Sequence, residues 1–407
     1  MRFSVRVVSC AVVVACVACR DVPQAPTQPP PPEAEPFAVL HVDHVRPLSD
    51  CCGLIAQPTL FADAAGSLHL LYGAWDVGAV RYAGCATDCA LAPSWRVGEV
   101  DSSFYGVGDG GQVTAGLTSS GIHLLYQSTV ANGQIAFLSY GWCPGSCYLK
   151  ASWQRGVVDT MAPITAAGSG GASAVVDPAG GIHALYLARD GVRYAACPAV
   201  CTNAANWQRA TLDSANSPAT ALALAGDGRL HALYFRSGNL WYATCATACG
   251  DSTNWQRGAI APPPTCCHLN SWTALAIGSD NRLHALFSAT TDTSWRISTL
   301  TYATCTASCT SAGNWRSLTV DSTASLGAIA LGADGAVHLM LGRTTGVFDG
   351  TIEYARCDTA CLSLAAWTRT SVDSTKRALS LTLALTLTGK PMIGVATFYD
   401  VYVALMR

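Results

Sequence analysis

The sequence predicts an all-β fold, a seven-bladed β-propeller over residues 37–407 with four antiparallel strands per blade. A fourteen-residue pattern, Y-x2-C-x3-C-x5-W, occurs six times with unchanged internal spacing. Each copy lies in a unit of about 50 residues that contains four short strands, which is typical of a propeller blade. The two ends of the chain hold complementary parts of a seventh unit. The copies begin at Tyr82, Tyr140, Tyr194, Tyr242, Tyr302 and Tyr354.

The four strands of a unit, A to D from the first to the last, follow from apolar alternation and turn residues. In the unit around Tyr242, strand A is expected at 220–225, strand B at 230–234 and strand C at 240–245. Strand D follows the tryptophan, as at 207–213 in the preceding unit. Period-2 patterning between Gly and Asp turns predicts strands, and no stretch has a helical period. Strand B carries a histidine at a fixed place: His69, His123, His183, His231, His284 and His338.

The last unit is incomplete at its C-terminal end. Strands are expected at 381–387, 391–397 and 401–406, with Met392 at the histidine position. Tyr402 is assigned to the repeated tyrosine and Leu405 to the first cysteine, after which the chain ends. The missing strand D is predicted at 39–43, so that the N-terminal strand closes the last blade. Closure removes free sheet edges, whereas an open β-solenoid is the alternative.

The cysteines are expected to form local disulfides. Each hairpin offers two sulfurs and no nearby histidine, which argues against a metal site in an exported protein. Six pairs have C-x3-C spacing: Cys85–Cys89, Cys143–Cys147, Cys197–Cys201, Cys245–Cys249, Cys305–Cys309 and Cys357–Cys361. Two vicinal disulfides are predicted between neighbours, Cys51–Cys52 and Cys266–Cys267. No metal ligand set and no cofactor motif is identified.

The N-terminus predicts export and a lipid anchor. Residues 1–18 combine Arg2 and Arg6 with an apolar stretch, as in a signal peptide, and the cysteines at its end resemble a bacterial lipobox. Pairing of the other cysteines favours Cys19 as the lipidated residue, Cys16 is the alternative, and a secretory signal without lipid is a third possibility. Residues 19–36 are rich in proline and predict an extended tether. The protein is therefore placed at the bacterial cell envelope, in an oxidising compartment.

Composition limits the partners. Only 12% of the residues are charged and the formal net charge is −2, so no basic patch indicates nucleic acid. After the N-terminus no apolar run approaches the ~18 residues of a membrane-spanning helix. The expected molecule is a monomer that contacts the membrane only through its lipid anchor.

Repeated residues are normally architectural, so the histidines, the aspartates ending strand D and the arginines after each tryptophan are predicted to be structural. The aspartates are expected in turns and the arginines in solvent. Function is expected where the repeats differ, on the face formed by the B–C and D–A connections. Aromatic rings beside charged groups suit sugar stacking or a protein partner. The candidate ligand-binding residues are Trp75, Asp76, Tyr105, Asp109, His268, Trp295, Arg296 and Arg343. The same face carries Trp272, Phe348, Asp349 and Asp400.

The segment Asp227–Tyr234, which reads D-G-x-x-H-x-x-Y, and the tryptophan opening strand D resemble the BNR or Asp-box repeats of sialidase-like propellers. The family turn S-x-D-x-G-x-T-W is absent, and a cysteine-bridged turn such as Cys249–Trp255 replaces it. The resemblance implies three substrate-binding arginines, a Tyr/Glu pair and an Asp for a sialidase. Only Arg296 and Arg343 are candidates for that set, so no catalytic residue is assigned.

The predicted function is therefore that of a surface-anchored, non-enzymatic binding propeller that recognises a glycan or a protein. Two alternatives stay open. One is a glycan-active enzyme, either a sialidase-like hydrolase or a polysaccharide lyase, and the other is a structural envelope lipoprotein.

Overall fold

The computed structural model describes residues 36–44, 58–74, 78–102, 113–130, 135–161, 172–215, 217, 219–261, 272–290, 298–346, 348–397 and 400–407. Residues 36–407 form one compact unit. The predicted signal peptide, tether, lipidated cysteine and vicinal cysteine pairs lie outside the described residues. Within the described ranges no helix is long and apolar enough to cross a membrane.

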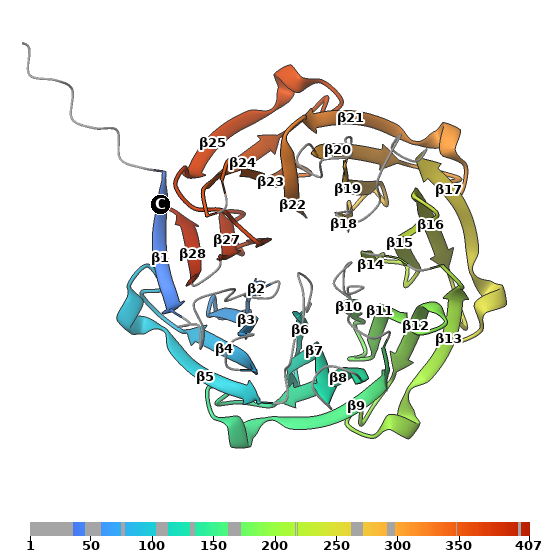
Figure 1. Cartoon of the computed structure of the whole chain (residues 1–407), viewed down its shortest axis with the longest axis horizontal. Coiled ribbons are helices and arrows are strands. Elements are labelled where there is room, and N and C mark those ends of the chain that lie inside the picture. Colours follow the sequence, from blue (N-terminus) through green and yellow to red (C-terminus); the bar gives the residue numbers. More distant parts are fainter. Residues whose placement is uncertain are drawn as a thin grey trace, which may run out of the picture. The chain divides into compact units, whose positions relative to one another are not determined.

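The described strands form seven four-stranded antiparallel sheets arranged in a ring, which confirms the predicted propeller (Figure 1). Blade 1 contains β2 (Thr59–Ala62), β3 (Leu68–Ala74), β4 (Ala79–Cys85) and β5 (Arg96–Asp101). Blade 2 contains β6 (Val113–Thr118), β7 (Gly121–Val130), β8 (Ile135–Cys143) and β9 (Gln154–Thr160). Blade 3 contains β10 (Ala172–Val176), β11 (Ile182–Ala188), β12 (Gly191–Cys197) and β13 (Gln208–Asp213).

Blade 4 contains β14 (Thr220–Leu224), β15 (Leu230–Arg236), β16 (Asn239–Cys245) and β17 (Gln256–Ala261). Blade 5 contains β18 (Trp272–Ile277), β19 (Leu283–Thr290), β20 (Ser298–Cys305) and β21 (Arg316–Asp321). Blade 6 contains β22 (Ala324–Leu331), β23 (Val337–Thr344), β24 (Gly350–Cys357) and β25 (Thr368–Asp373). Blade 7 contains β26 (Ser380–Leu385), β27 (Pro391–Ala396), β28 (Asp400–Met406) and β1 (Phe37–His44).

The N-terminal strand closes the ring as predicted. In blade 7 the strand order is β1-β28-β27-β26, and β1 pairs antiparallel with β28 from Phe37↔Met406 to His44↔Asp400. Hydrophobic side chains of adjacent blades pack together around the ring, as where Leu185 and Tyr194 of blade 3 meet Leu222 of blade 4. Blade 7 therefore joins the N-terminal and C-terminal strands in one sheet, and β28 has no free edge.

The register of the last blade differs from the sequence prediction by one position. Met392 pairs with Leu405 as His231 pairs with Thr244 in blade 4. Gly394 consequently pairs with Val403, as Leu233 pairs with the repeated tyrosine Tyr242. Val403 therefore stands at the tyrosine position and Met406 at the cysteine position, and the assignment of Tyr402 and Leu405 was wrong. The sequence misled because a tyrosine happens to occupy the neighbouring position.

Six disulfides join the ends of strand C to the following turn, as predicted, with Cα atoms 5.6–5.9 Å apart. Each closes a very short loop and is worth about 2 kcal/mol by loop entropy. The tryptophan that follows donates its indole N–H to the carbonyl of the second cysteine, as from Trp255 to Cys249 at 3.0 Å. One 3-10 turn lies in each hairpin: η2 (Ala92–Ser94), η3 (Lys150–Ser152), η4 (Ala204–Asn206), η5 (Ser252–Asn254), η6 (Ala312–Asn314) and η7 (Leu364–Ala366). We call the connection between strands C and D, which contains the disulfide and the 3-10 turn, the staple loop.

The repeated tyrosine of strand C links neighbouring blades. Its ring packs edge-on against the tryptophan of the next blade, as for Tyr194 and Trp255, whose centroids are 5.4 Å apart. At the junction of blades 6 and 7, Phe37 takes the place of that tryptophan and lies 5.7 Å from Tyr354. The closing strand therefore supplies the aromatic partner that the last blade lacks.

A buried hydrogen bond also crosses most junctions between blades. The tyrosine of strand B donates to the aspartate ending strand D of the preceding blade, as from Tyr234 to Asp213 at 3.0 Å. Equivalent bonds join Tyr72 to Asp43, Tyr126 to Asp101 and Tyr186 to Asp159, and Tyr402 of strand C reaches Asp373. These aspartates were predicted as turn residues. The structure adds that they hold adjacent blades together.

Four of the six arginines that follow the tryptophans bond to the preceding blade, which corrects the prediction that they are solvated. Arg155 donates to Asp101 at 2.9 Å and Arg209 to the carbonyl of Val158 at 2.9 Å, both in the preceding blade. Arg257 and Arg369 make the same kind of bond to Leu212 and Val320. A long side chain on the outer strand reaches across the junction because blade edges lie close together. The sequence shows only where the arginine lies on its own strand and does not show which blade its side chain reaches.

Candidate functional site: the loop face

The loop face is formed by the B–C and D–A connections, as the antiparallel strand order requires. Seven of the eight predicted ligand-binding residues lie outside the described residues: Trp75, Asp76, Tyr105, Asp109, His268, Trp295 and Arg296. Their roles stay predictions. Arg343 is described, together with Trp272, Phe348, Asp349 and Asp400 on the same face.

Arg343, on β23, lies in a four-residue ion-pair cluster between blades 5 and 6. Its Nη2 atom donates to Asp321 Oδ2 at 2.6 Å and to Glu353 Oε2 at 2.7 Å. Arg369 Nη1 donates to the same two oxygens at 3.1 and 3.3 Å. In blade 6, Leu341 occupies the position that a tyrosine has in strand B of other blades. Asp321 therefore accepts hydrogen bonds from arginines, whereas the equivalent aspartates of other blades accept one from that tyrosine.

The electrostatics of this cluster keep both acids ionised. Burial alone would raise the pKa of Asp321, but hydrogen bonds from Arg343 and Thr323 outweigh it and hold that pKa well below its usual range. The hydrogen bond from Arg343 lowers the pKa of Glu353. Hydrogen bonds to Glu353 and Asp321 in turn raise the pKa of Arg343. Neither carboxyl is poised as a general acid near neutral pH. Here Arg343 acts in the junction, and a ligand-binding role for it stays a prediction.

Phe348 offers an exposed aromatic ring on the same face. It lies in the β23–β24 connection with 54% of its surface exposed, followed by Asp349. Its carbonyl accepts a hydrogen bond from Arg377 N at 2.8 Å, which joins this connection to the one after β25. The adjacent Lys376 donates Nζ to Asp400 Oδ2 at 2.8 Å. We call these five residues, Phe348, Asp349, Lys376, Arg377 and Asp400, the Phe348 surface.

Sequence reasoning singled out three members of the Phe348 surface and missed Lys376 and Arg377. Both follow Asp373, at the end of strand D, within three to four residues. Their place in a D–A connection could have marked them as loop-face residues. Other connections also contain single charged residues, so that place alone does not distinguish them. The backbone bond to Phe348 and the ion pair to Asp400 bring them together, and both depend on the neighbouring blade.

The repeated histidines are structural, as predicted. In each of blades 1 to 6 a hydrogen bond joins histidine Nδ1 to the hydroxyl of the repeated tyrosine, at 2.5–2.8 Å. His231 and His284 are 8% and 7% exposed. In the part of the chain that the structure describes, no group of three or more His, Cys, Asp or Glu is placed to hold a metal ion.

These histidines predict an acid-sensitive fold. Burial, helped by the nearby Arg229 and Arg282, lowers the pKa of His231 and of His284 from 6.5 to about 4. Below about pH 6.5 the unfolded chain therefore binds protons that the folded chain does not, so stability is full above that pH. It should fall as the pH drops from about 6.5 to about 4.

Chemical denaturation across this pH range measures how steeply the unfolding free energy changes with pH. The double variant His231→Gln, His284→Gln provides the control, because it retains all carboxylates but removes two titrating rings. A slope unchanged in that variant would contradict the assignment.

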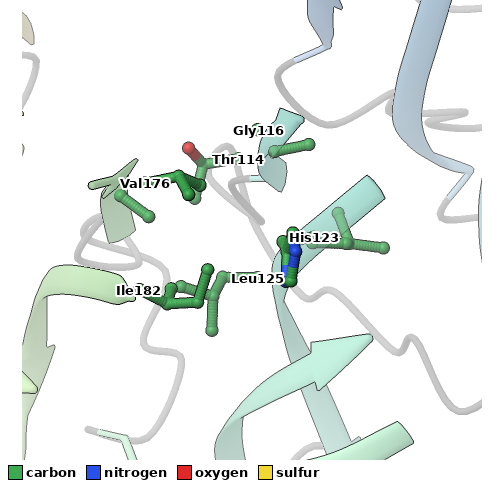
Figure 2. A pocket seen from close by; sticks show the side chains of 9 residues that line it. Thr114, Gly116, His123, Leu125, Val176 and Ile182 are labelled. Carbon is green, nitrogen blue, oxygen red and sulfur yellow. The ribbon is translucent and has the colours of Figure 1, made fainter. Parts of the chain in front are cut away.

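A cavity between blades 2 and 3 does not have room for a ligand. Figure 2 shows its lining side chains, which include Thr114 and His123 of blade 2 and Val176 and Ile182 of blade 3. Its volume is about 10 Å³, room for at most one water molecule. Its walls are largely apolar, so it is a packing gap between blades.

No protein-family profile matches this chain, and no curated protein sequence matches it. Solved structures do share its fold. An ulvan lyase of polysaccharide lyase family PL25, bound to -[GlcA(1-4)Rha3S]-, is 10% identical, has a TM-score of 0.58 and covers 90% of this chain and 96% of its own. The SapL1 lectin in complex with alpha methyl fucoside is 12% identical, with a TM-score of 0.49 and coverage of 80% and 97%. At these identities the likeness concerns the fold alone.

Proposed function

We propose that this protein is a non-enzymatic glycan-binding propeller, anchored at the bacterial cell envelope through Cys19, with Cys16 as the alternative anchor. It binds its ligand on the loop face. The observation that carries the proposal is the Phe348 surface, an exposed ring bordered by charged groups on the face where the blades differ. The opposite face carries a staple loop in each of blades 1 to 6.

Sugar recognition matches the chemistry of this surface. An exposed aromatic ring stacks on the apolar C–H face of a sugar, and charged neighbours bind its hydroxyl or acidic groups. Asp349, Lys376, Arg377 and Asp400 supply both signs of charge around Phe348. The six disulfides support an oxidising, extracellular setting. The fold shared with an ulvan lyase that holds an acidic glycan makes acidic glycans the first class to test.

A glycan array probed with residues 36–407 tests the proposal, because all seven blades lie within that segment. The variant Phe348→Ala should weaken binding of the best glycan about tenfold, as expected for loss of one aromatic anchor. Leu364→Ala is the matched control, because Leu364 is also 54% exposed but lies in a staple loop on the opposite face. Equal affinities of the two variants would contradict a site at Phe348. Absence of binding to every glycan on the array would favour a protein partner or a structural role.

The same glycans test the enzymatic alternative. A lyase leaves an unsaturated sugar that absorbs ultraviolet light, and a hydrolase releases reducing ends. Turnover of any array ligand by the unmodified chain would overturn the non-enzymatic proposal.

A further inference from the structure

The junction between blades 6 and 7 differs from the others on the staple face. Elsewhere the staple loop of one blade lies directly over strand D of the preceding blade. A Cβ atom placed on Gly98, Gly156 or Gly258 would come within 2.1 Å of a carbonyl oxygen of that loop. Blade 7 has no staple loop, because its strands C and D, β28 and β1, come from opposite ends of the chain. Strand β25 of blade 6 therefore lacks the cover that β5, β9 and β17 have (Figure 1).

A groove of about 340 Å³ occupies this place. Its walls come from β24 and the following turn, from β25, from the β26–β27 turn and from β28. The lining residues are Tyr354, Arg356, Asp358, Thr368, Thr370, Thr388, Gly389, Lys390, Pro391 and Met406. We call it the seam groove. Its volume lies at the lower end of the range for ligand sites, about 300–1,000 Å³, which suits one or two sugar units.

The seam groove is lined by Thr370 at a position where blades 1 to 5 have glycine, alanine or leucine. Thr370 pairs with the repeated tyrosine Tyr354, just as Gly258 pairs with Tyr242. At the glycine positions a loop backbone approaches so closely that a Cβ atom would collide with it. Thr370 places a branched side chain there and offers a hydroxyl. Blades 3 and 5 have Ala210 and Leu318 at the same position, so a side chain there does not by itself exclude a loop. What sets Thr370 apart is its hydroxyl, which a polar ligand can bind.

Lys390 is the lining residue of the seam groove that can pair with an acidic ligand. Arg356 is fully paired, since it donates to Asp358 at 2.8 Å and to Asp334 at 2.9 Å, and these three side chains together carry one negative charge. Lys390 belongs to a turn fixed by the bond from its backbone N–H to Thr386 Oγ1 at 2.9 Å. Among the described residues its ammonium group has no ion-pair partner, and the hydroxyls of Thr368 and Thr370 make no side-chain hydrogen bond. One cation and two hydroxyls therefore stand available around the groove.

We propose that the seam groove binds a carboxylated sugar unit, a uronate, as a second glycan site on the face opposite the Phe348 surface. Lys390 pairs with the carboxylate, and Thr368 and Thr370 bind ring hydroxyls. Pro391, which is buried, and Met406, which is half-buried, supply apolar contact for the C–H face of the sugar. The site arises where the ring closes, beside the blade whose strands C and D come from opposite ends of the chain. It does not depend on glycan binding at the loop face.

Two matched probes isolate the carboxylate: 4-nitrophenyl β-D-glucuronide and 4-nitrophenyl β-D-glucoside, titrated by calorimetry or ligand-observed NMR into the intact chain. The glucuronide should bind and the glucoside should bind about tenfold more weakly, the loss expected for one charge-assisted hydrogen bond. Lys390→Ala should weaken the glucuronide by the same factor and leave the glucoside unchanged. Thr370→Phe should weaken both by filling the groove. Leu387→Ala, 74% exposed in the same turn but outside the lining, is the control and should change neither.

Several results would overturn the seam groove. One is equal binding of the two probes, and another is absence of glucuronide binding. Retention of glucuronide affinity in both Lys390→Ala and Thr370→Phe would count equally against it. Loss of glucuronide binding in Phe348→Ala, with Lys390→Ala unaffected, would move the uronate to the loop face. Because Lys390 is exposed, a melting curve of Lys390→Ala that matches the unmodified chain shows that its effect is not unfolding.

Discussion

A chain that begins at residue 45 should lose at least about 5 kcal/mol of unfolding free energy relative to one that begins at Pro36. The eight residues of β1 close blade 7. Phe37 is 3% exposed and packs on Tyr354, and removal of a buried phenylalanine costs about 3–5 kcal/mol. Asp43 accepts hydrogen bonds from Tyr72 at 2.6 Å and Arg81 at 2.6 Å, so both lose a partner. The exposed edge of β28 adds a hazard of aggregation.

Thermal unfolding followed by circular dichroism, with limited proteolysis, compares the two chains. The chain that begins at Pro36 is the matched control, because it lacks the predicted tether but keeps the closing strand. Equal melting temperatures for the two chains would show that β1 is dispensable and would contradict closure. A single substitution, Phe37→Ala, gives a graded version in case the shorter chain cannot be purified.

Asp213→Ala should destabilise the propeller by about 3 kcal/mol. The Asp213 side chain is 3% exposed. It accepts hydrogen bonds from Tyr234, which is fully buried, and from Arg236 at 3.1 Å. The alanine variant leaves the tyrosine hydroxyl buried without its acceptor, whereas Arg236, with 44% of its side chain exposed, can turn to water. Most of the cost should therefore come from the tyrosine.

The junction between blades 4 and 5 provides the control for this prediction. There the chain has Ala261 at the aspartate position and Phe287 at the tyrosine position, so both partners are replaced together. Adding Tyr234→Phe to Asp213→Ala should restore much of the lost stability, although Tyr234→Phe alone should cost about 1 kcal/mol. Chemical denaturation of the four proteins gives the coupling energy. Strictly additive effects would show that the buried bond does not link the blades.

Several features could be predicted because they depend on residues close together in the chain. The spacing of Tyr242, Cys245, Cys249 and Trp255 defines a local hairpin, and the predicted Cys245–Cys249 disulfide is present. The indole bond from Trp255 to Cys249 was not predicted. Closure was predictable because Val42-Asp43 matches the Val-Asp or Leu-Asp pair near the end of strand D in five of the other six blades. The histidine positions were correctly assigned to structure, since a residue repeated in every blade cannot converge on one site.

Contacts between blades could not be predicted in the same way. Asp213 and Tyr234 each have an adequate local explanation, a turn and a strand, and their bond depends on how one blade stacks on the next. The arginine prediction failed for this reason, and the register of Tyr402 was misjudged because pairing with β27 decides it. For the loop face, the roles of residues such as Trp295 and Arg296 stay predictions.

The sequence by itself determined the number of blades, the order of strands, the six staple loops and the strand that closes the ring. These depend on short-range patterning and on counting repeats, and both are properties of the chain. Only the tertiary structure decided which charges are neutralised, which aromatic ring is exposed and where space is left. The seam groove shows the reason. It is bounded by β24, β25 and the β26–β27 turn, and it exists because a loop present at other junctions is missing from blade 7. The groove is formed by residues that are distant in the sequence, so its presence depends on how the blades pack against each other.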